Sequence, residues 1–211
     1  DTMETELNDM ANLSNEESFR NFIDGNLGTG FIEEAEPFFR WKVEFTKEQL
    51  AETINAHLYE RIVAMPENIL AKNSKGKYEK KEISSVGEIE SIEITKRGDS
   101  GIIEEMKING TEEKILVKGQ ANARALLSPE HVTIQKQDGS TASGWTTLPS
   151  AYFYVDDEDG IVICGGGFGH GVGMSQNGAN DMAKLGYTAR DIIEHYYTAV
   201  ELKDMYEMMG K

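Results

Sequence analysis

The chain has 211 residues, enough for one domain of ordinary size with a hydrophobic core, or for a domain with an extension. Hydrophobic residues make up 39% and charged residues 27%, which is typical of a folded protein rather than a disordered one. The 37 acidic residues outnumber the 21 basic ones and give a net charge of −16, which argues against non-specific binding to nucleic acid or to anionic lipid. The same charge would suit a neutral or cationic partner, or serve solubility alone.

The sequence shows no pattern typical of a membrane segment, an export signal or a disulfide. The sequence holds no run of about 18 apolar residues, so no membrane contact is expected within this segment. The first residues are acidic rather than apolar, so the chain is expected to be either not exported or a mature or trimmed part of a longer protein. Cys164 is the single cysteine, which excludes an intramolecular disulfide and a four-cysteine zinc site.

The N-terminal part combines acidic residues with the start signal of a helix. Residues 1–36 are predicted to be an acidic lead-in with a short helix, and so an extension of the domain. Ser14 and Glu17 fit a capping box at the start of that helix, with Ser14 as the N-cap residue. Residues 24–37 hold three glycines and a proline and are expected to form a connector.

A strand and a helix follow in the clearest patterns of the chain. Over residues 39–46 apolar and charged side chains alternate, which predicts a half-buried strand of an antiparallel sheet. Thr46 and Gln49 then fit a second capping box, and apolar residues recur at helical spacing over 50–58. These two elements are expected to contribute one face each to the core.

The middle and C-terminal parts are predicted to be hairpins and short helices. Asn109-Gly110 is a strong signal for a type I′ turn and so for a β-hairpin. The acidic run at 156–160 is interpreted as an exposed turn, because it lacks the spacing of an EF-hand calcium loop. The further elements expected are a loop or exposed hairpin at 66–82, strands at 89–96, 102–108, 115–117, 152–155 and 161–163, and helices at 122–127, at 179–185 and from 189 onward. Together they predict an α+β fold of mainly antiparallel strands and hairpins with several short helices, two of them after a glycine-rich loop.

That glycine-rich loop is the most informative part of the sequence. Six glycines fall within the nine residues 165–173, and they surround His170. Because glycine loses the most conformational freedom on folding, such a cluster indicates a backbone that turns at positive φ or lies close against something. Phosphate binding is excluded by spacing, since no Gly-Lys-Ser/Thr follows and no three glycines fit G-x-G-x-x-G. No pair of the four histidines has the spacing of a zinc helix, so no metal or cofactor is predicted.

Two interpretations of this loop stay open from the residues alone. In the first, the loop is the wall of a groove for a neutral polymer, where bare backbone hydrogen-bonds sugar hydroxyl and N-acetyl groups. Phe168 would pack on a sugar face, His170, Ser175 and Gln176 would make directed polar contacts, and His170 could also act in acid–base chemistry. In the second, the glycines let the loop pack tightly into the domain, with His170 buried and hydrogen-bonded.

The stretch Gly166–Ala179 resembles the signature of the stage II sporulation protein D and amidase-enhancer domain family, whose usual form is G-[RK]-G-[WF]-G-H-G-V-G-M-S-Q-[YW]-G-A. Gly166 stands here in place of the basic residue, and Asn177 in place of the aromatic one. The resemblance extends over residues 37–205, which are interpreted as the C-terminal two-thirds of such a domain, followed by a tail at 206–211.

The family resemblance implies work on the bacterial cell wall. Stage II sporulation protein D is a lytic transglycosylase that cleaves peptidoglycan freed of stem peptides during engulfment, and its amidase-enhancer relatives stimulate a cell-wall amidase. The resemblance therefore implies binding and cleavage of glycan strands in sporulation or wall remodelling, with glycan strands as partner, and an amidase or other sporulation wall hydrolases as further partners. The location implied is extracytoplasmic and facing the wall, with the full-length protein membrane-anchored or secreted. The implied substrate-binding residues are Gly167, Phe168, Gly169, His170, Gly171, Gly173, Met174, Ser175, Gln176 and Gly178.

The catalytic acid is not identified in this sequence. In the family, the proposed catalytic glutamate lies in an alanine-rich helical segment resembling E-A-L-K-A-Q-A-V-A-A-R, and no stretch of that kind occurs here. The catalytic glutamate is therefore expected upstream of this chain, and the fragment alone is expected to be inactive. The alternatives are a non-catalytic peptidoglycan-binding or amidase-enhancing module, and a scaffold whose acidic surface docks a partner.

Overall fold

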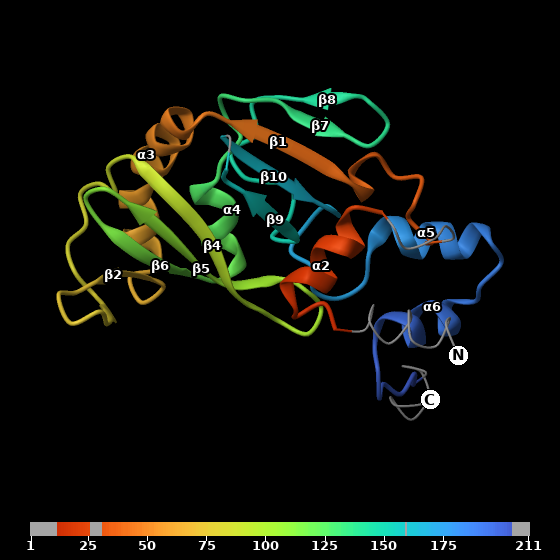
Figure 1. Cartoon of the computed structure of the whole chain (residues 1–211). Coiled ribbons are helices and arrows are strands. Elements are labelled where there is room, and N and C mark those ends of the chain that lie inside the picture. The colour runs from red at the N-terminus through yellow and green to blue at the C-terminus, as the bar shows by residue number, and fades with distance from the viewer. Residues whose placement is uncertain (1–11, 26–30, 159, 204–211) are drawn as a thin grey trace. The chain divides into compact units, whose positions relative to one another are not determined.

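Two antiparallel sheets of five strands each carry the larger part of the chain. Figure 1 shows how their strands and the helices follow one another along the chain. The computed structural model describes residues 12–25, 31–158 and 160–203. The chain divides into two compact units. Unit 1 comprises Asp1–Gly28 and Pro37–Gly171, and unit 2 comprises Thr29–Glu36 and Val172–Lys211. The predicted boundaries at residues 37 and 205 stay predictions. Residues 1–11 and 26–30 of the predicted lead-in and all of the predicted tail lie outside the described residues.

Unit 1 contains both sheets, whose strand pairs are all antiparallel. The first sheet has the order β8 (Thr141–Ala142), β7 (Ile134–Lys136), β1 (Trp41–Phe45), β10 (Ile161–Gly165) and β9 (Phe153–Asp156). The second has the order β3 (Tyr78–Glu79), β2 (Ile69–Lys72), β6 (Lys114–Lys118), β5 (Ile103–Gly110) and β4 (Ile89–Arg97). The helical elements of unit 1 are α2 (Glu16–Ile23), the 3-10 turn η1 (Pro37–Phe39), α3 (Lys47–Ala64) and α4 (Gln120–Leu126).

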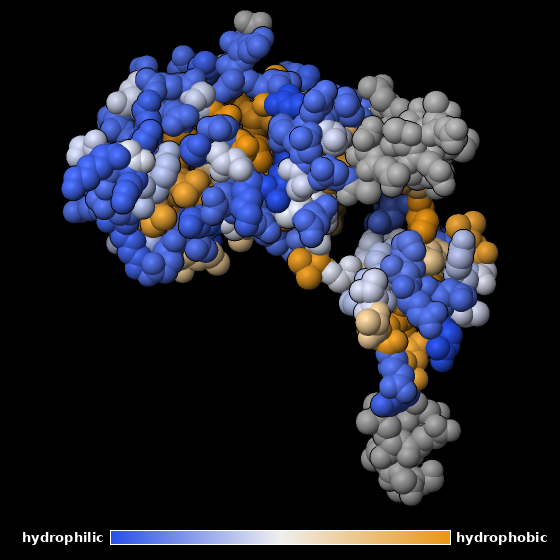
Figure 2. Space-filling model, turned by 60° about the horizontal axis from the view of Figure 1, so that its bottom comes forward, coloured by the Kyte–Doolittle hydropathy of each residue, from blue (hydrophilic) through white to orange (hydrophobic). Residues whose placement is uncertain are grey.

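Unit 2 is small and helical in its described part. Its helices are α5 (Gln176–Lys184) and α6 (Ala189–Tyr196), and the second begins with a capping box formed by Thr188 and Asp191. Among the described residues, seven of the eleven exposed large apolar side chains belong to this unit. In Figure 2, by contrast, hydrophilic side chains cover most of the visible face of the larger unit. A unit of this size cannot enclose a full core of its own.

The predicted α+β class is confirmed, and so are the two clearest local patterns. Trp41, Val43 and Phe45 are buried at alternate positions of β1, which starts at Trp41 because η1 occupies the residues before it. Thr46 caps α3 through the predicted capping box. The apolar face of α3, both sheets and α4 share one core, so β1 and α3 do supply it together.

The predicted turn at Asn109-Gly110 is wrong by two residues. Both residues belong to β5, Asn109 pairs with Lys114, and the N–H of Gly110 donates to the carbonyl of Glu113 at 3.0 Å. A side chain at Gly110 would place its Cβ 2.0 Å from the carbonyl oxygen of Val86. The glycine is therefore required by a close contact with a distant segment, not by the turn.

Helix starts are also shifted from their predicted places. Asn15, not Ser14, is the N-cap of α2 and accepts from the N–H of Ser18 at 3.1 Å. In unit 2, α5 begins at Gln176, three residues before the predicted start. The polar stretch at 66–82 does form a hairpin, made of β2 and β3. Within the described residues, no helix combines the length and apolar character that a membrane span needs.

A buried arginine fastens α2 to the sheets. The Arg97 side chain, on β4, is 2% exposed, and its Nε donates to the Glu16 carboxylate at 2.8 Å. Its Nη1 and Nη2 donate to the carbonyls of Gly101 and Phe153 at 2.9 and 2.8 Å, and its guanidinium lies over the Phe19 ring at 3.6 Å. Burial lowers the pKa of Arg97, with Glu16 acting in the opposite direction. Each of the three nitrogen atoms of this guanidinium thus donates to a partner inside the protein.

Two further arginines hold the same helix at other points. Arg20, on α2 itself, donates from Nη2 to the carbonyl of Val155 on β9 at 2.7 Å. Arg40 donates from Nε to the carbonyl of Ile23 and from Nη2 to that of Phe22, both at 2.9 Å. Carbonyls of the last turn have no partner within a helix, so Arg40 both satisfies and anchors the end of α2.

Replacing Arg97 by alanine is expected to destabilise unit 1 by about 3 kcal/mol, because the Glu16 carboxylate and two buried carbonyls lose their donor. Urea denaturation followed by tryptophan fluorescence measures this loss. The matched control is Lys107→Ala, which removes an exposed ion pair with Glu93 and should cost less than about 1 kcal/mol. Equal losses for the two variants would contradict the role given to Arg97.

Candidate functional site

The glycine-rich loop begins at the end of β10, directly over the buried indole of Trp41. Gly165, the last residue of β10, pairs with Trp41 of β1. A Cβ on Gly165 would lie 2.4 Å from Cζ2 of Trp41, closer than carbon atoms approach. The residue at 165 must therefore be glycine for the ring to lie where it does. We call Gly165–Gly171 the signature loop; all of it belongs to unit 1.

Much of the backbone of the signature loop is hydrogen-bonded inside the protein. The N–H of Gly166 donates to the carbonyl of Tyr152 at 2.9 Å, and the hydroxyl of Ser150 donates to the carbonyl of Gly166 at 2.7 Å. Trp41 Nε1 donates to the carbonyl of Gly167 at 3.1 Å. The N–H of Gly166 is thus used inside the protein, and the carbonyls of Gly166 and Gly167 each accept one internal hydrogen bond, while the groove wall that the sequence predicts stays a prediction.

The aromatic residue of the loop lies on two others. Phe168 is 67% exposed, and its ring stacks on Phe38 at a centroid distance of 5.5 Å and an angle of 29°. Trp145 meets Phe168 edge-on at 5.5 Å and lies 5.1 Å from Phe38. We call Phe38, Trp145 and Phe168 the aromatic platform. Its members come from η1, from the segment before β9 and from the signature loop.

Positive φ angles carry the loop past this platform. Gly167 and Gly169 have φ angles of 74° and 123°, and the N–H of Gly169 donates to the carbonyl of Pro149 at 2.9 Å. Gly171 has a φ of 71°, and its Cβ position lies 2.7 Å from Cδ1 of Ile102. His170, between them, is exposed. The alternative with a buried His170 is therefore wrong, although the tight packing that it assumed is real.

The second half of the signature belongs to unit 2 and serves mainly to start α5. Ser175 is the N-cap residue, accepts from the N–H of Gly178 at 3.1 Å, and donates from its hydroxyl to the carboxylate of Glu33. A Cβ on Gly178 would lie 2.0 Å from the hydroxyl oxygen of Tyr196, so this glycine lets α6 approach. Asn177 donates to the carboxylate of Glu36 at 2.9 Å.

The ten predicted site residues are thus divided between the units. Five of them, Gly167 to Gly171, lie in the signature loop. The other five lie in unit 2 and are Gly173, Met174, Ser175, Gln176 and Gly178. In unit 2, Met174 and Gln176 are exposed, and the N–H of Met174 donates to the hydroxyl of Tyr197 at 3.2 Å. Their predicted contact with a substrate stays a prediction.

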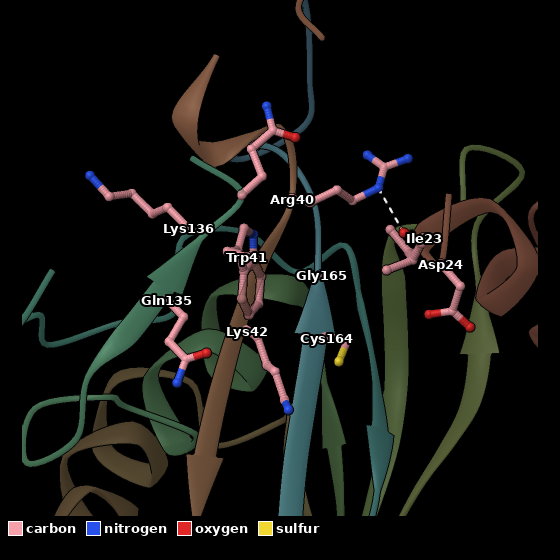
Figure 3. A pocket seen from close by; sticks show the side chains of 10 residues that line it. Ile23, Asp24, Arg40, Trp41, Lys42, Gln135, Lys136, Cys164 and Gly165 are labelled. Atoms are coloured by element: carbon pink, nitrogen blue, oxygen red, sulfur yellow. Dashed lines mark hydrogen bonds between the residues drawn. The ribbon is translucent and has the colours of Figure 1, made fainter. Parts of the chain in front are cut away.

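A hollow lies beside the signature loop, on the first sheet of unit 1 (Figure 3). Its volume is 240 Å³. It is lined by Ile23, Asp24, Arg40, Trp41, Lys42, Gln135, Lys136, Gln137, Cys164 and Gly165. Sequence reasoning missed this hollow and also Phe38 and Trp145, because strand pairing and not sequence distance brings these residues together.

The titratable groups near the hollow have shifted pKa values of clear origin. Burial raises the pKa of the Cys164 thiol, so this cysteine stays protonated and is a poor nucleophile. Burial likewise raises the pKa of Tyr152 to about 12. In the described part of the chain, no group of three or more His, Cys, Asp and Glu side chains is arranged to hold a metal ion.

Comparison with known proteins relates this α+β domain and its glycine signature to two kinds of bacterial protein. Stage II sporulation protein D of Bacillus amyloliquefaciens is 49% identical over 51 residues, which are 24% of this chain and 15% of that protein. The amidase enhancer of Bacillus subtilis (strain 168) is 29% identical over 136 residues, 64% of this chain and 18% of that protein. These matches confirm the resemblance to that family; the chain spans less than a fifth of the length of each relative.

A family model also matches most of the chain. A domain of unknown function, DUF8618, matches residues 1–70 and 65–173, and the chain belongs to this family. The match ends at residue 173, within the glycine block, and so includes the aromatic platform and the signature loop.

The packing of Gly165 on Trp41 leads to a test. Gly165→Ala should destabilise unit 1 by about 2 to 3 kcal/mol and change the near-ultraviolet circular dichroism of Trp41, because the added Cβ overpacks the indole. Gly139→Ala is the control, since Gly139 has a φ of 80° but open space around its Cβ position, and should cost only about 1 kcal/mol. An unchanged tryptophan signal in Gly165→Ala would refute the close contact.

Proposed function

We propose that this chain binds the glycan strands of bacterial peptidoglycan through the aromatic platform and the signature loop. The observation that carries the proposal is Phe168, an exposed ring held on the glycine signature by Phe38 and Trp145. An exposed apolar ring with polar groups beside it suits a sugar, which offers C–H bonds on one face and hydroxyl groups around its edge. The matches to a sporulation protein and an amidase enhancer support a function at the cell wall.

We further propose that the bound strands are cleaved by lytic transglycosylase-type chemistry in sporulation or wall remodelling. In such a reaction, a carboxylic acid protonates the glycosidic oxygen and the bond from C1 to that oxygen breaks. The C6 hydroxyl of the muramoyl unit then bonds to C1 and gives its proton to the resulting carboxylate, which forms the anhydro product. His170, exposed beside Phe168, would make a polar contact to the strand. We assign no residue of this chain as the acid, and expect that the chain by itself does not turn over glycan strands.

The proposed substrate also gives the proposed location. Peptidoglycan lies outside the cytoplasmic membrane, so the protein would act extracytoplasmically, facing the wall, as part of a membrane-anchored or secreted protein. A partner at that place would be a cell-wall amidase or another wall hydrolase.

A second candidate function is that of a non-catalytic amidase-enhancing module. The observation that favours it is the alignment with the amidase enhancer, which runs over 136 residues, against 51 for the sporulation protein of Bacillus amyloliquefaciens. The two candidates share the glycan-binding step and differ in the event that binding leads to, which is cleavage of the strand in one case and stimulation of an amidase in the other.

Phe168→Ala and Trp145→Ala should each weaken binding to glycan strands by about tenfold, because each removes an aromatic surface from the platform. Co-sedimentation with insoluble peptidoglycan, or titration calorimetry with soluble strands, measures the affinity. The control is Tyr59→Ala, a change at an aromatic residue on α3 that is 77% exposed and belongs to unit 1 but not to the platform. Equal affinity of all three variants and the wild type would refute the platform as the binding surface.

Cleavage and enhancement are separated by a second measurement. With purified wall as substrate, the chain alone should release no anhydro sugar, which mass spectrometry of soluble products would detect. Added to a cell-wall amidase, it should raise the rate of stem-peptide release only if the enhancer function holds. Release of anhydro sugar by the chain alone would show that it contains its own acid.

A further inference from the structure

The helix α3 (orange in Figure 1) carries apolar side chains on its outer side as well as on the side that packs in the core. On the outer side Ala56, Tyr59 and Val63 are exposed, Tyr59 by 77% and Val63 by 63%. We call these three residues the outer stripe of α3. A helix that is apolar on both sides is normally covered on both sides, so the outer stripe is a surface without its cover.

Large exposed apolar side chains of unit 1 are concentrated at this place. Among the described residues of unit 1 there are four, and three of them belong to α3 or to its C-cap: Tyr59, Val63 and Met65. The fourth is Phe168 of the aromatic platform. Tyr and Val are also poorer helix formers than the Ala, Glu or Lys that suit an exposed helix surface. Neither solubility nor helix stability therefore explains the outer stripe.

The spacing of the outer stripe suits a second helix. Glu52, Ala56, Tyr59 and Val63 follow one another at intervals of four, three and four residues, which is the spacing of the row by which one helix packs along another. This row is about 17 Å long, so a partner helix of about 12 residues would run along it. An extended strand presents every second side chain to one face and does not match this spacing.

Two carboxylates beside the outer stripe lack a cation. Glu52 and Glu60 are exposed, and neither forms an ion pair with another described residue. On the second sheet, by contrast, Glu93 is paired with Lys107 at 3.2 Å. A partner that brings Lys or Arg to Glu52 and Glu60 would be complementary in charge as well as in apolar surface.

We propose that the outer stripe of α3 is a docking surface for an amphipathic helix of another protein. The partner helix packs apolar side chains on Tyr59 and Val63 and places Lys or Arg side chains against Glu52 and Glu60. This surface is separate from the aromatic platform and does not depend on the proposed glycan binding.

A second copy of this chain is a poorer occupant than a basic helix. None of the exposed residues of α3 is Lys or Arg, so two α3 helices packed together would leave Glu52 and Glu60 of both copies without a cation. Two chains with a net charge of −16 also repel each other. The same carboxylates would repel an anionic membrane surface.

The test uses three synthetic 14-residue peptides that differ in pattern or in charge. The first has Leu at intervals of four and three residues with Lys beside them, the second has Glu in place of each Lys, and the third has the composition of the first in scrambled order. Fluorescence anisotropy with a labelled peptide measures the affinity. The wild-type protein should bind the first peptide at least tenfold more tightly than either of the others.

Substitutions then locate the binding. Tyr59→Ala should weaken binding of the first peptide about tenfold, and Glu52→Gln and Glu60→Gln about threefold each, as expected for exposed ion pairs. The matched control is Glu17→Gln on α2, which removes an exposed carboxylate away from α3 and should leave the affinity unchanged. Thermal unfolding followed by circular dichroism checks that the variants stay folded.

Each other result would overturn the proposal. Equal binding of the scrambled peptide would reduce the effect to general attraction by an acidic chain, and an unchanged affinity of Tyr59→Ala would place the peptide elsewhere. Self-association in sedimentation velocity that Tyr59→Ala abolishes would assign the outer stripe to a second copy. Glycan binding by Tyr59→Ala should stay unchanged in every case, so this proposal and the proposed function fail separately.

Discussion

The contact between Trp41 and the glycine block is the constraint on which the candidate site depends. The indole lies in the core of unit 1, yet its face meets Gly165 and its Nε1 holds the carbonyl of Gly167. One buried side chain thus fixes both the point where the loop leaves the sheet and the direction that it then takes. Phe168 reaches the surface from this fixed base, so its ring is presented at little further loss of conformational freedom.

Charge and apolar surface are combined in one region of unit 1. Arg40 anchors the last turn of α2 and also lines the hollow on the first sheet, and the ammonium nitrogen of Lys136 lies 5.3 Å from the centroid of the Phe38 ring.

Local patterns were predictable from the sequence, and long-range contacts were not. The alternation along β1 and the capping box at Thr46 follow from neighbouring residues, so both were predicted correctly. Gly110 was predicted to be a turn glycine. The contact that requires a glycine there is with the carbonyl of Val86, which belongs to another part of the chain and could not be predicted from neighbouring residues. The contact between the rings of Trp145 and Phe168 likewise depends on the folded chain, because the two residues are far apart in the sequence. Ser175 precedes a helix, so its role as a cap was readable locally, but the family resemblance favoured a substrate contact instead.

The central claim is that glycan strands bind at the aromatic platform and the signature loop. Hydrogen–deuterium exchange with and without soluble glycan strands tests it most directly, because it locates the contact without any substitution. The account predicts slower exchange in the segments that hold Trp145 and Gly167–Gly171, with no change in β4 and β5 of the second sheet. Protection confined to the second sheet, or to α6, would contradict the account.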